Sequence, residues 1–239
     1  MKFFSETFTG AGGRPYNEDS VGVWQMRGGL LAIAADGLGR HGGGDIASKI
    51  AVDVLSSHCL HTPSMAQEAV LEGFAKANQA VLARQTPACE MKSTAALLLC
   101  LEDSAAIAHI GDTRGYHFSG GRVAFQTTDH SVSQLAVMQG EITPAQIRFH
   151  ADRSRLIKAL GNETDQPGAQ FHRMDRLRPG DAFLLCSDGF WEYVTEAEME
   201  ADLQKSATPG AWLSLMLRRV GRRVDGKHDN LSAIAVFCV

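Results

Sequence analysis

Short apolar runs that carry an aspartate at one end constrain the fold of this chain more than any other feature of its sequence. Three runs end in an aspartate and a fourth follows one, in the segments 30–36, 105–112, 183–188 and 229–237. Short apolar runs bounded by turn residues are typical of buried strands. Two of the aspartates precede a glycine, as Asp36-Gly37 and Asp188-Gly189, and glycine permits a sharp exit from a strand. We therefore expect strands whose tips present carboxylates.

The first run is predicted to form one arm of a β-hairpin over residues 20–35, with a glycine turn in its middle. If the turn has three residues and the strands pair symmetrically about it, Asp19 lies beside Gly37. Glu18 and Asp36 then lie at the same open end of the hairpin. The hairpin alone therefore predicts a meeting of acidic side chains that are far apart in the sequence.

Helices are expected between the strands, without a regular alternation of strand and helix. Asp45 is a candidate cap for one helix, and a second helix is predicted over residues 64–85. Capping residues at Thr143, Thr195 and Thr208 mark three further helix starts, two of them followed by proline. Hairpins and helices in this order favour an α+β fold in which helices cover antiparallel sheets.

Composition excludes several classes of protein. The chain has 239 residues with 44% apolar and 21% charged residues, which is typical of an ordinary globular protein. Without a repeat or linker, we expect a single domain over residues 1–239. The net charge of -4 gives no reason to expect a nucleic-acid or membrane surface. Five scattered cysteines and an N-terminus without an apolar leader predict a cytoplasmic protein.

The strand-tip carboxylates are candidates for a metal site. In antiparallel sheets the end of one strand lies beside the start of its neighbour. Asp36, Asp112 and Asp188 end strands, whereas Asp19 and Asp229 precede them, so all can converge on one edge. A divalent cation would remove their mutual repulsion, and Mg²⁺ or Mn²⁺ would leave room for phosphate oxygens. Each aspartate taken alone could instead be a turn former or a helix cap.

Two further residues suit phosphate chemistry. The guanidinium of Arg14 matches two phosphate oxygens, although a surface arginine paired with an acid is the alternative. His41, in the glycine-rich loop 37–44, could protonate a leaving oxygen or be an ordinary loop residue. The loop itself has neither the P-loop nor the dinucleotide-binding spacing of glycines.

Seven short motifs occur in order along the chain: Arg14-Pro15-Tyr16-Asn17-Glu18-Asp19, Ala35-Asp36-Gly37-Leu38-Gly39-Arg40-His41, Ser93-Thr94-Ala95, Ile110-Gly111-Asp112-Thr113-Arg114, Thr128-Asp129-His130-Ser131, Ser187-Asp188-Gly189 and Asp229-Asn230. In this order they resemble the motifs of the metal-dependent serine/threonine protein phosphatases of type 2C. Each motif alone is common, but the ordered set is specific. The resemblance implies a central sandwich of two antiparallel β-sheets flanked by pairs of α-helices, with metal ions in a cleft at one edge.

The resemblance also implies which residues hold the metal ions. Asp36 would bridge two ions, and Gly37 would contribute its carbonyl oxygen. Asp188 and Asp229 would complete the ligand shell of the first ion. Asp19 would hold the second ion directly or through water.

Other residues are expected to assist these ligands. Glu18 and Asn230 would support the metal shell, Glu18 directly or through water. Arg14 would bind the substrate phosphate, and His41 would protonate the leaving serine or threonine oxygen. These roles follow from the family resemblance and from the chemistry of each side chain.

The resemblance also implies a third ion and a flap-like insert, although the motifs for them are less regular. Asp112 and Asp188 would hold a possible third ion, assisted by Glu192, which replaces the commoner aspartate. Arg40 stands where glycine is usual, and Leu38 where methionine is usual. Residues 129–180 correspond to a flap-like insert.

The function expected from the sequence is hydrolysis of phosphoserine and phosphothreonine in proteins by a metal-activated water. Two Mn²⁺ or Mg²⁺ ions are expected, with a possible third. The expected partners are phosphorylated proteins and a cognate serine/threonine kinase pathway, and the chain is expected to be a monomer. Two alternatives remain at this point: a non-catalytic domain of the same fold that binds phosphoproteins, and a metal-dependent phosphatase of small molecules.

Overall fold

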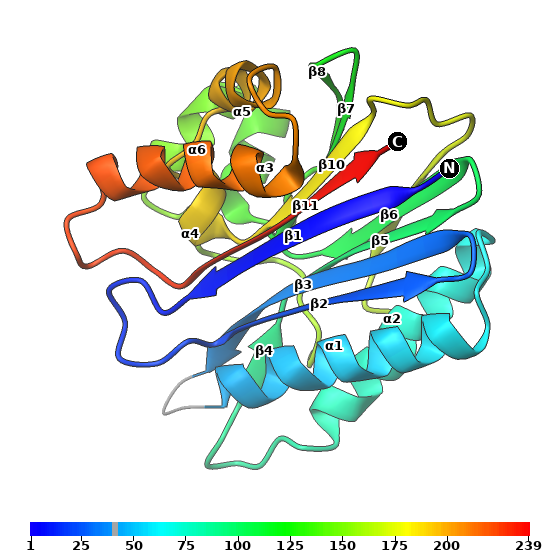
Figure 1. Ribbon diagram of the computed structural model, residues 1–239. Coiled ribbons are helices and arrows are strands. Elements are labelled where there is room, and N and C mark those ends of the chain that lie inside the picture. The colour runs from blue at the N-terminus through cyan, green and yellow to red at the C-terminus, as the bar shows by residue number, and fades with distance from the viewer. Residues whose placement is uncertain (40–42) are drawn as a thin grey trace.

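The computed structural model of the chain describes residues 1–39 and 43–239. The predictions for Arg40 and His41 therefore lie outside the described residues. Two antiparallel sheets stack face to face, and helices cover both outer faces (Figure 1). This arrangement confirms the predicted α+β sandwich.

The sandwich is built from two sheets in which every neighbouring pair of strands is antiparallel. The first sheet has the spatial order β1 (Phe3–Gly10), β11 (Leu231–Cys238), β10 (Ala182–Cys186), β7 (Arg114–Ser119) and β8 (Arg122–Gln126). The second has the order β2 (Asp19–Met26), β3 (Gly29–Gly39), β5 (Ala95–Leu101), β6 (Ser104–Ile110) and β9 (Gln170–Met174), with β4 (Met91–Ser93) also paired to β3. Strands alternate in direction, so the tips that carry aspartates reach one edge.

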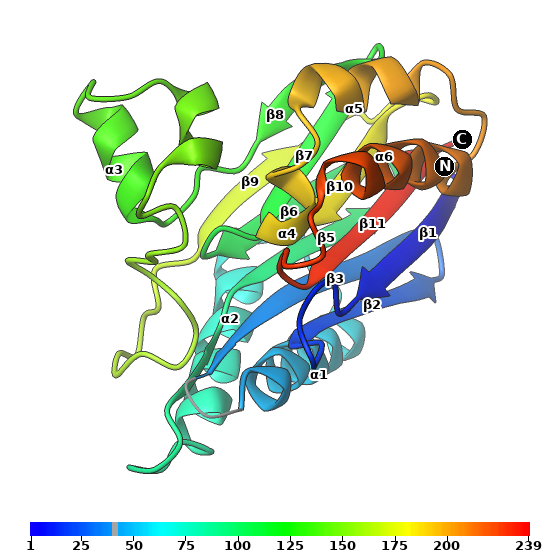
Figure 2. The same ribbon diagram turned by 90° about the vertical axis from the view of Figure 1, so that its left-hand side faces the viewer.

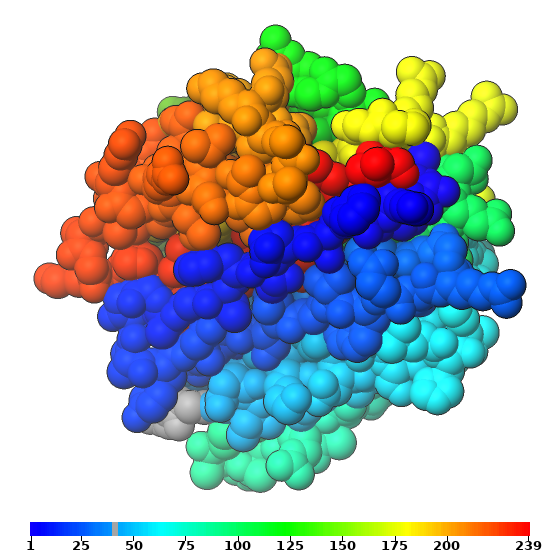
Figure 3. Space-filling view, viewed as in Figure 1, coloured from blue at the N-terminus to red at the C-terminus, as the bar shows by residue number. Residues whose placement is uncertain are grey.

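Helices form the two outer layers. The second sheet is covered by α1 (Gly44–His61) and α2 (Gln67–Leu82). The first sheet is covered by α4 (Asp188–Trp191), α5 (Glu196–Leu203) and α6 (Pro209–Arg223). In the space-filling view, the edge strands β1 and β2 form a band between α6 and α1, so the two sheets meet at the surface (Figure 3). No described helix has the length and apolar character needed to cross a membrane.

The continuous apolar runs are explained by burial on both faces of each sheet. In β3, Leu31 and Ile33 pack toward α1 and α2, whereas Leu30 and Ala32 pack between the two sheets. All four side chains are fully buried. Since neither face of these strands meets water, the usual alternation of apolar and polar residues is absent.

The segment between β8 and β9 stands away from the sandwich (Figure 2). It contains α3 (Val132–Met138) and a short 3-10 helix, η1 (Pro144–Phe149). The predicted cap at Thr143 is present, but the helix that it starts is 3-10. Residues 170–174 form β9 and belong to the second sheet, so the irregular part of the predicted 129–180 segment ends before them.

The hairpin prediction was correct in topology and wrong in register by one residue. Its turn contains only Arg27 and Gly28, because Met26 pairs with Gly29. Asp19 therefore faces Asp36, where the symmetric three-residue turn had placed Gly37. The one-residue difference brings the two carboxylate-bearing residues directly opposite each other.

The start of α5 contains the predicted capping box. Thr195 N donates to Glu198 Oε2 at 3.1 Å, and both Arg219 and Arg223 donate to the same carboxylate. The hydrogen bond from Arg223 is the main cause that lowers the pKa of Glu198 to about 2. Since the folded pKa lies below the unfolded value of about 4.3, this group stabilises the fold above pH 4.3, and its contribution is lost as the pH falls toward 2.

We expect Glu198→Gln to destabilise the protein by about 1–2 kcal/mol at pH 7, after allowance for solvent screening. The difference from the wild type should shrink steadily between about pH 4 and pH 2. Urea unfolding midpoints at pH 7 and pH 3 measure both effects. Glu163→Gln, at an exposed position, is the matched control. An equal destabilisation at both pH values would refute the electrostatic explanation.

Candidate active site

A cleft of about 870 Å³ opens at the edge where the aspartate-bearing strand tips converge. Its lining includes Arg14 and Asn230. Most of the acidic residues that the sequence singled out also line it, namely Glu18, Asp36, Asp112, Asp188 and Asp229. Asp19 is buried behind them, with 8% of its surface exposed. The fold thus brings together residues that lie more than 200 positions apart in the sequence.

Asp36 is held by its backbone inside β3, because this strand continues to Gly39, beyond the end that the sequence predicted at Asp36. Its amide donates to Thr94 Oγ1 at 3.0 Å, and its carbonyl accepts from Thr94 N at 2.9 Å and from Ser93 Oγ at 3.1 Å. The carboxylate itself is left to face the cleft. At Gly37, a Cβ would lie 1.9 Å from the carbonyl oxygen of Gly44, so only glycine lets α1 start against this strand.

Asp19 and Glu18 are fixed from the other sheet. Ser187 Oγ donates to Asp19 Oδ2 at 2.8 Å. The amide of Glu18 donates to Asn230 Oδ1 at 2.8 Å, and Asn230 Nδ2 donates to two carbonyls, including that of Tyr16 at 2.8 Å. Asn230 therefore connects the segment before β2 to the segment before β11 at the edge of the site.

Asp188 and Asp112 approach from the first sheet and from the end of β6. Asp188 begins α4, and a Cβ on the following Gly189 would lie 2.1 Å from Asn230 O. Trp191 Nε1 donates to the carbonyl oxygen of Asp112 at 2.9 Å. The short helix α4 therefore positions both carboxylates at once.

Arg14 lies against Asp229 at the mouth of the cleft. Their side chains form an ion pair of 2.7 Å and are 56% and 47% exposed. The hydrogen bond to Asp229 is the main cause that raises the pKa of Arg14. A guanidinium bound through one nitrogen retains donors for the oxygens of an incoming phosphate.

The carboxylates raise one another's pKa. Burial is the first cause that raises the pKa values of Asp36 and Asp188 well above those of ordinary aspartates, and the neighbouring acids add to it. Burial also raises the pKa of Asp19 to about 6 and that of Asp112 to about 7. Burial raises the pKa of Glu18 as well. Such a cluster is costly to ionise unless a cation offsets the charge.

The donor set fits a hard divalent cation. Asp19 Oδ1 and Asp188 Oδ1 are buried and have no hydrogen-bond partner among the described residues, although an unpaired buried oxygen is costly. Among these residues, no group of three or more acids, histidines or cysteines is already arranged as a metal cage. Ions such as Mg²⁺ keep several waters and need few protein ligands, so carboxylates that converge without forming a closed cage suit them.

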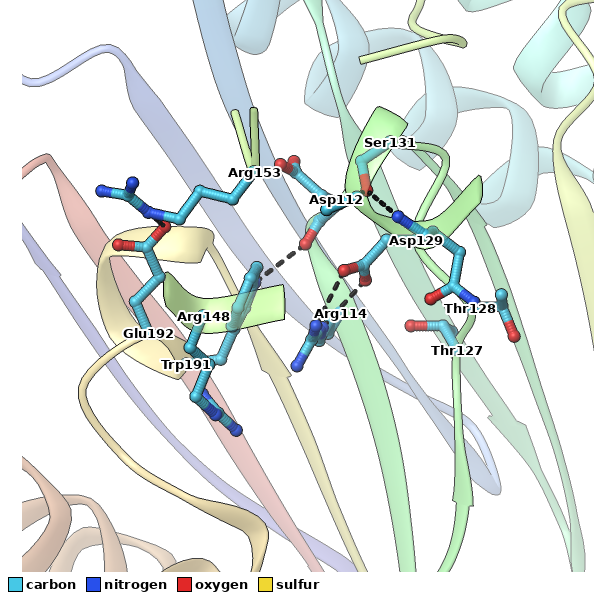
Figure 4. A network of polar contacts seen from close by, with 12 residues as sticks. Asp112, Arg114, Thr127, Thr128, Asp129, Ser131, Arg148, Arg153, Trp191 and Glu192 are labelled. Carbon is cyan, nitrogen blue, oxygen red and sulfur yellow. Dashed lines mark hydrogen bonds and ion pairs between the residues drawn. The ribbon is translucent and has the colours of Figure 1, made fainter. Parts of the chain in front are cut away.

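Glu192 has a partner that the sequence did not predict. Arg153, from the segment beyond η1, donates to Glu192 Oε1 at 2.6 Å (Figure 4). The Glu192 side chain is 14% exposed, and burial raises its pKa although Arg153 opposes this shift. A third ion held by Asp112 and Glu192 would therefore have to compete with an existing ion pair.

A buried ionic network lies behind Asp112 (Figure 4). Arg114 donates two hydrogen bonds to Asp129, at 2.8 and 2.7 Å, and its guanidinium stacks on the Trp191 ring at 3.5 Å. Arg148 donates to Glu196 at 2.6 Å, and its guanidinium lies 5.4 Å from the ring centroid of the same tryptophan. The network fixes Trp191 and, through its indole N–H, the backbone of Asp112.

Sequence reasoning missed several residues that shape the site. Thr94 and Ser187 were noted only as parts of motifs, although their hydroxyls position Asp36 and Asp19. Arg153 and Lys92 were not noted at all. The partners of these residues come from distant segments, so the only available signal was that Thr94 and Ser187 belong to two of the seven motifs.

The fold and site define a sandwich protein with a carboxylate-lined cleft suited to metal ions and phosphate. The family model for protein phosphatase 2C matches residues 13–225 of the chain. The chain therefore belongs to the protein phosphatase 2C family.

The chain is similar to two curated bacterial proteins. It is 32% identical over 195 residues to the serine/threonine protein phosphatase PstP of Mycobacterium tuberculosis, covering 80% of this chain and 37% of PstP. It is 28% identical over 232 residues to the serine/threonine phosphatase stp of Listeria innocua, covering 93% of this chain and 90% of stp. The chain thus spans only about a third of PstP but most of stp.

Solved structures agree with the fold. The serine/threonine phosphatase of S. agalactiae has a TM-score of 0.86 at 23% identity and covers 100% of both chains. The catalytic domain of PstP, in complex with two manganese ions, has a TM-score of 0.75 at 27% identity and covers 98% of this chain and 97% of that one.

Proposed function

We propose that this chain is a metal-dependent phosphatase that hydrolyses phosphoserine and phosphothreonine in proteins. The observation that carries the proposal is the cluster of buried carboxylates at one sheet edge, with Arg14 at its mouth. Membership of the protein phosphatase 2C family and the names of its relatives support the same reaction. Ser154 and Leu156 of the 129–169 segment also line the cleft, so this segment can contact a bound protein substrate.

We propose that Asp36, Asp188 and Asp229 hold the first ion, and that Asp19 supports the second, as Mn²⁺ or Mg²⁺. When bound, such ions supply an acidified water as the nucleophile and offset the charge on the phosphate oxygens. Arg14 binds two of those oxygens, and Asp229 orients its guanidinium. Gly37 contributes a backbone carbonyl at the tip of β3.

Further roles are proposed for the other residues that the motifs indicate. Glu18 and Asn230 hold the strand tips in register, and His41 protonates the leaving oxygen. Asp112 and Glu192 take a third ion when Arg153 releases Glu192. We also propose that the chain is a cytoplasmic monomer that opposes a serine/threonine kinase, and that residues 129–169, the part of the predicted 129–180 segment that precedes β9, act as its flap.

Removal of divalent cations tests the proposed reaction. The purified chain should hydrolyse p-nitrophenyl phosphate and a phosphothreonine peptide in Mn²⁺, lose both activities in EDTA, and recover them when Mn²⁺ is added in excess. The reason is that the carboxylates alone repel the phosphate and provide no nucleophile. Initial rates before and after chelation give the result. Undiminished hydrolysis in EDTA would rule out the metal-dependent reaction.

A further inference from the structure

Lys92 occupies an unusual position at the cleft. It lies on β4, opposite Leu38 of β3, and its half-buried side chain lines the cleft. The next two residues of the chain, Ser93 and Thr94, hold the backbone of Asp36 by hydrogen bonds. Lys92 is therefore fixed close to the reaction centre by the same strand that fixes a proposed metal ligand.

Arg14 and Lys92 approach the tip of β3 from opposite sides. Arg14 precedes β2, which pairs with one edge of β3, whereas β4 pairs with the other edge. A phosphate bound at Arg14 therefore leaves Lys92 facing the neighbouring part of a substrate.

Among the described residues, no acidic side chain forms an ion pair with Lys92. Within residues 1–39 and 43–239, Arg14 and Lys92 are the basic side chains that line the cleft. Arg14 is paired with Asp229, whereas Lys92 takes part in no ion pair of the described residues. Exposed Glu90 also lines the cleft two residues away, without a salt bridge to Lys92. A cation that faces an otherwise acidic cleft favours ligands with negative charge at that point.

We propose that Lys92 binds a second negative charge on the substrate, next to the phosphorylated residue. This inference rests on the proposed function and names its substrate class: phosphoproteins in which an acidic or a second phosphorylated residue flanks the phosphoserine or phosphothreonine. The surrounding carboxylates repel such a flanking charge, and Lys92 offsets this repulsion on the β4 side of the cleft.

The test compares three phosphothreonine peptides of one sequence, whose flanking residue is glutamine, glutamate or phosphoserine. In Mn²⁺, the wild type should show kcat/KM values about two- to fivefold higher for the charged peptides, as expected for a solvent-accessible ion pair. Lys92→Gln should bring this ratio to about 1, and Lys92→Glu should invert it. The change should lie in KM, and 0.5 M salt should weaken the preference. The peptide with the larger preference identifies which charge is bound.

Glu90→Gln is the matched control, because it removes a charge from the same strand region but should preserve or raise the preference. Equal kcat/KM values of the wild type for all three peptides would overturn the proposal. So would a Lys92→Gln variant that loses the same factor on every peptide, since Lys92 would then act on the reacting phosphate or the fold.

Binding measurements separate this proposal from the proposed reaction. Fluorescence anisotropy with the same peptides in EDTA-treated protein reports the preference without turnover. A wild-type protein that hydrolyses no peptide but binds the charged ones more tightly, through Lys92, would contradict the proposed reaction alone. Equal binding of all three peptides would contradict the role of Lys92.

Discussion

Replacing Asp36 by asparagine is expected to remove most of the phosphatase turnover and to make the metal-free protein more stable. The carboxylate of Asp36 faces the cleft, where burial and the charges of Asp19 and Asp188 raise its pKa well above the ordinary range. Asparagine keeps the shape of the side chain but removes its charge. It therefore relieves repulsion in the folded state and weakens the binding of any cation.

The expected gain in stability of Asp36→Asn depends on pH, and its pH dependence follows from the direction in which the pKa of Asp36 is shifted. An aspartate in an unfolded chain ionises near pH 3.9. Since the pKa of Asp36 is raised in the fold, its ionisation disfavours folding above about pH 4 and has no effect below it. In EDTA, the wild type and Asp36→Asn should therefore unfold at similar urea concentrations at pH 4. The variant should be more stable by about 1–3 kcal/mol at pH 8.

Two measurements check this prediction. Turnover of p-nitrophenyl phosphate in Mn²⁺ should fall by about two to three orders of magnitude, comparable to the loss of one preorganised electrostatic contact. Adding Mn²⁺ should raise the unfolding midpoint of the wild type more than that of the variant. Asp53→Asn, on the exposed side of α1, serves as control because Asp53 pairs only with Lys49 in the described structure. A variant that keeps its turnover, or is less stable at pH 8, would exclude Asp36 as a charged ligand.

Strand-tip aspartates could be predicted from sequence because their positions depend on local pattern and on strand direction. Apolar runs mark the strands, and antiparallel pairing sends their tips to one edge. The register of the first hairpin was less certain from sequence, since Gly28 and Gly29 allow turns of two or three residues. The structure uses the two-residue turn, which places Asp19 opposite Asp36.

Strands without a continuous apolar run were not predicted from the sequence. Strand β9, with the sequence Gln-Phe-His-Arg-Met, lies at a sheet edge and exposes several polar side chains. Strand β1 also lies at an edge and was not predicted. Edge strands bury one face at most, so the hydrophobic pattern that marks central strands is weak in them.

Contacts between distant polar residues had no sequence signal beyond the place of Ser187 in one of the motifs. Ser187 donates a hydrogen bond to Asp19, which lies 168 positions away in the sequence, and Arg153 donates to Glu192, which lies 39 positions away. In its local sequence, none of these residues differs from an ordinary surface or loop residue. Such pairs are set by the packing of α4 and of the 129–169 segment against the sheets, which local propensity does not specify.

Arg114→Met is expected to be the most destabilising substitution outside the cleft. The side chains of Arg114 and Asp129 are only 4% and 2% exposed and are joined by two hydrogen bonds. Methionine preserves much of the volume but leaves the carboxylate of Asp129 buried without its counterion. The loss of one partner of a buried ion pair costs about 3–5 kcal/mol, a large part of the stability of an ordinary domain.

Urea unfolding of three variants separates charge from packing. Adding Asp129→Leu to Arg114→Met should restore a large part of the lost stability, because it removes the uncompensated charge. Arg122→Met is the matched control at an exposed pair: Arg122 is 74% exposed and 2.7 Å from Glu200, so its loss should cost at most about 1 kcal/mol. Equal costs for the two arginines, or no rescue in the double variant, would contradict the argument.

The double variant also distinguishes stability from positioning of the site. Arg114 stacks on Trp191, whose indole N–H donates to the backbone of Asp112. If the network only stabilises the fold, the rescued double variant should regain wild-type kcat at a temperature where it is fully folded. We expect a persistent loss of about tenfold, since methionine and leucine lack the guanidinium on which the indole ring rests, and a loosened Trp191 no longer fixes the strand end that presents Asp112. Recovery of full kcat would reduce the network to a purely structural role.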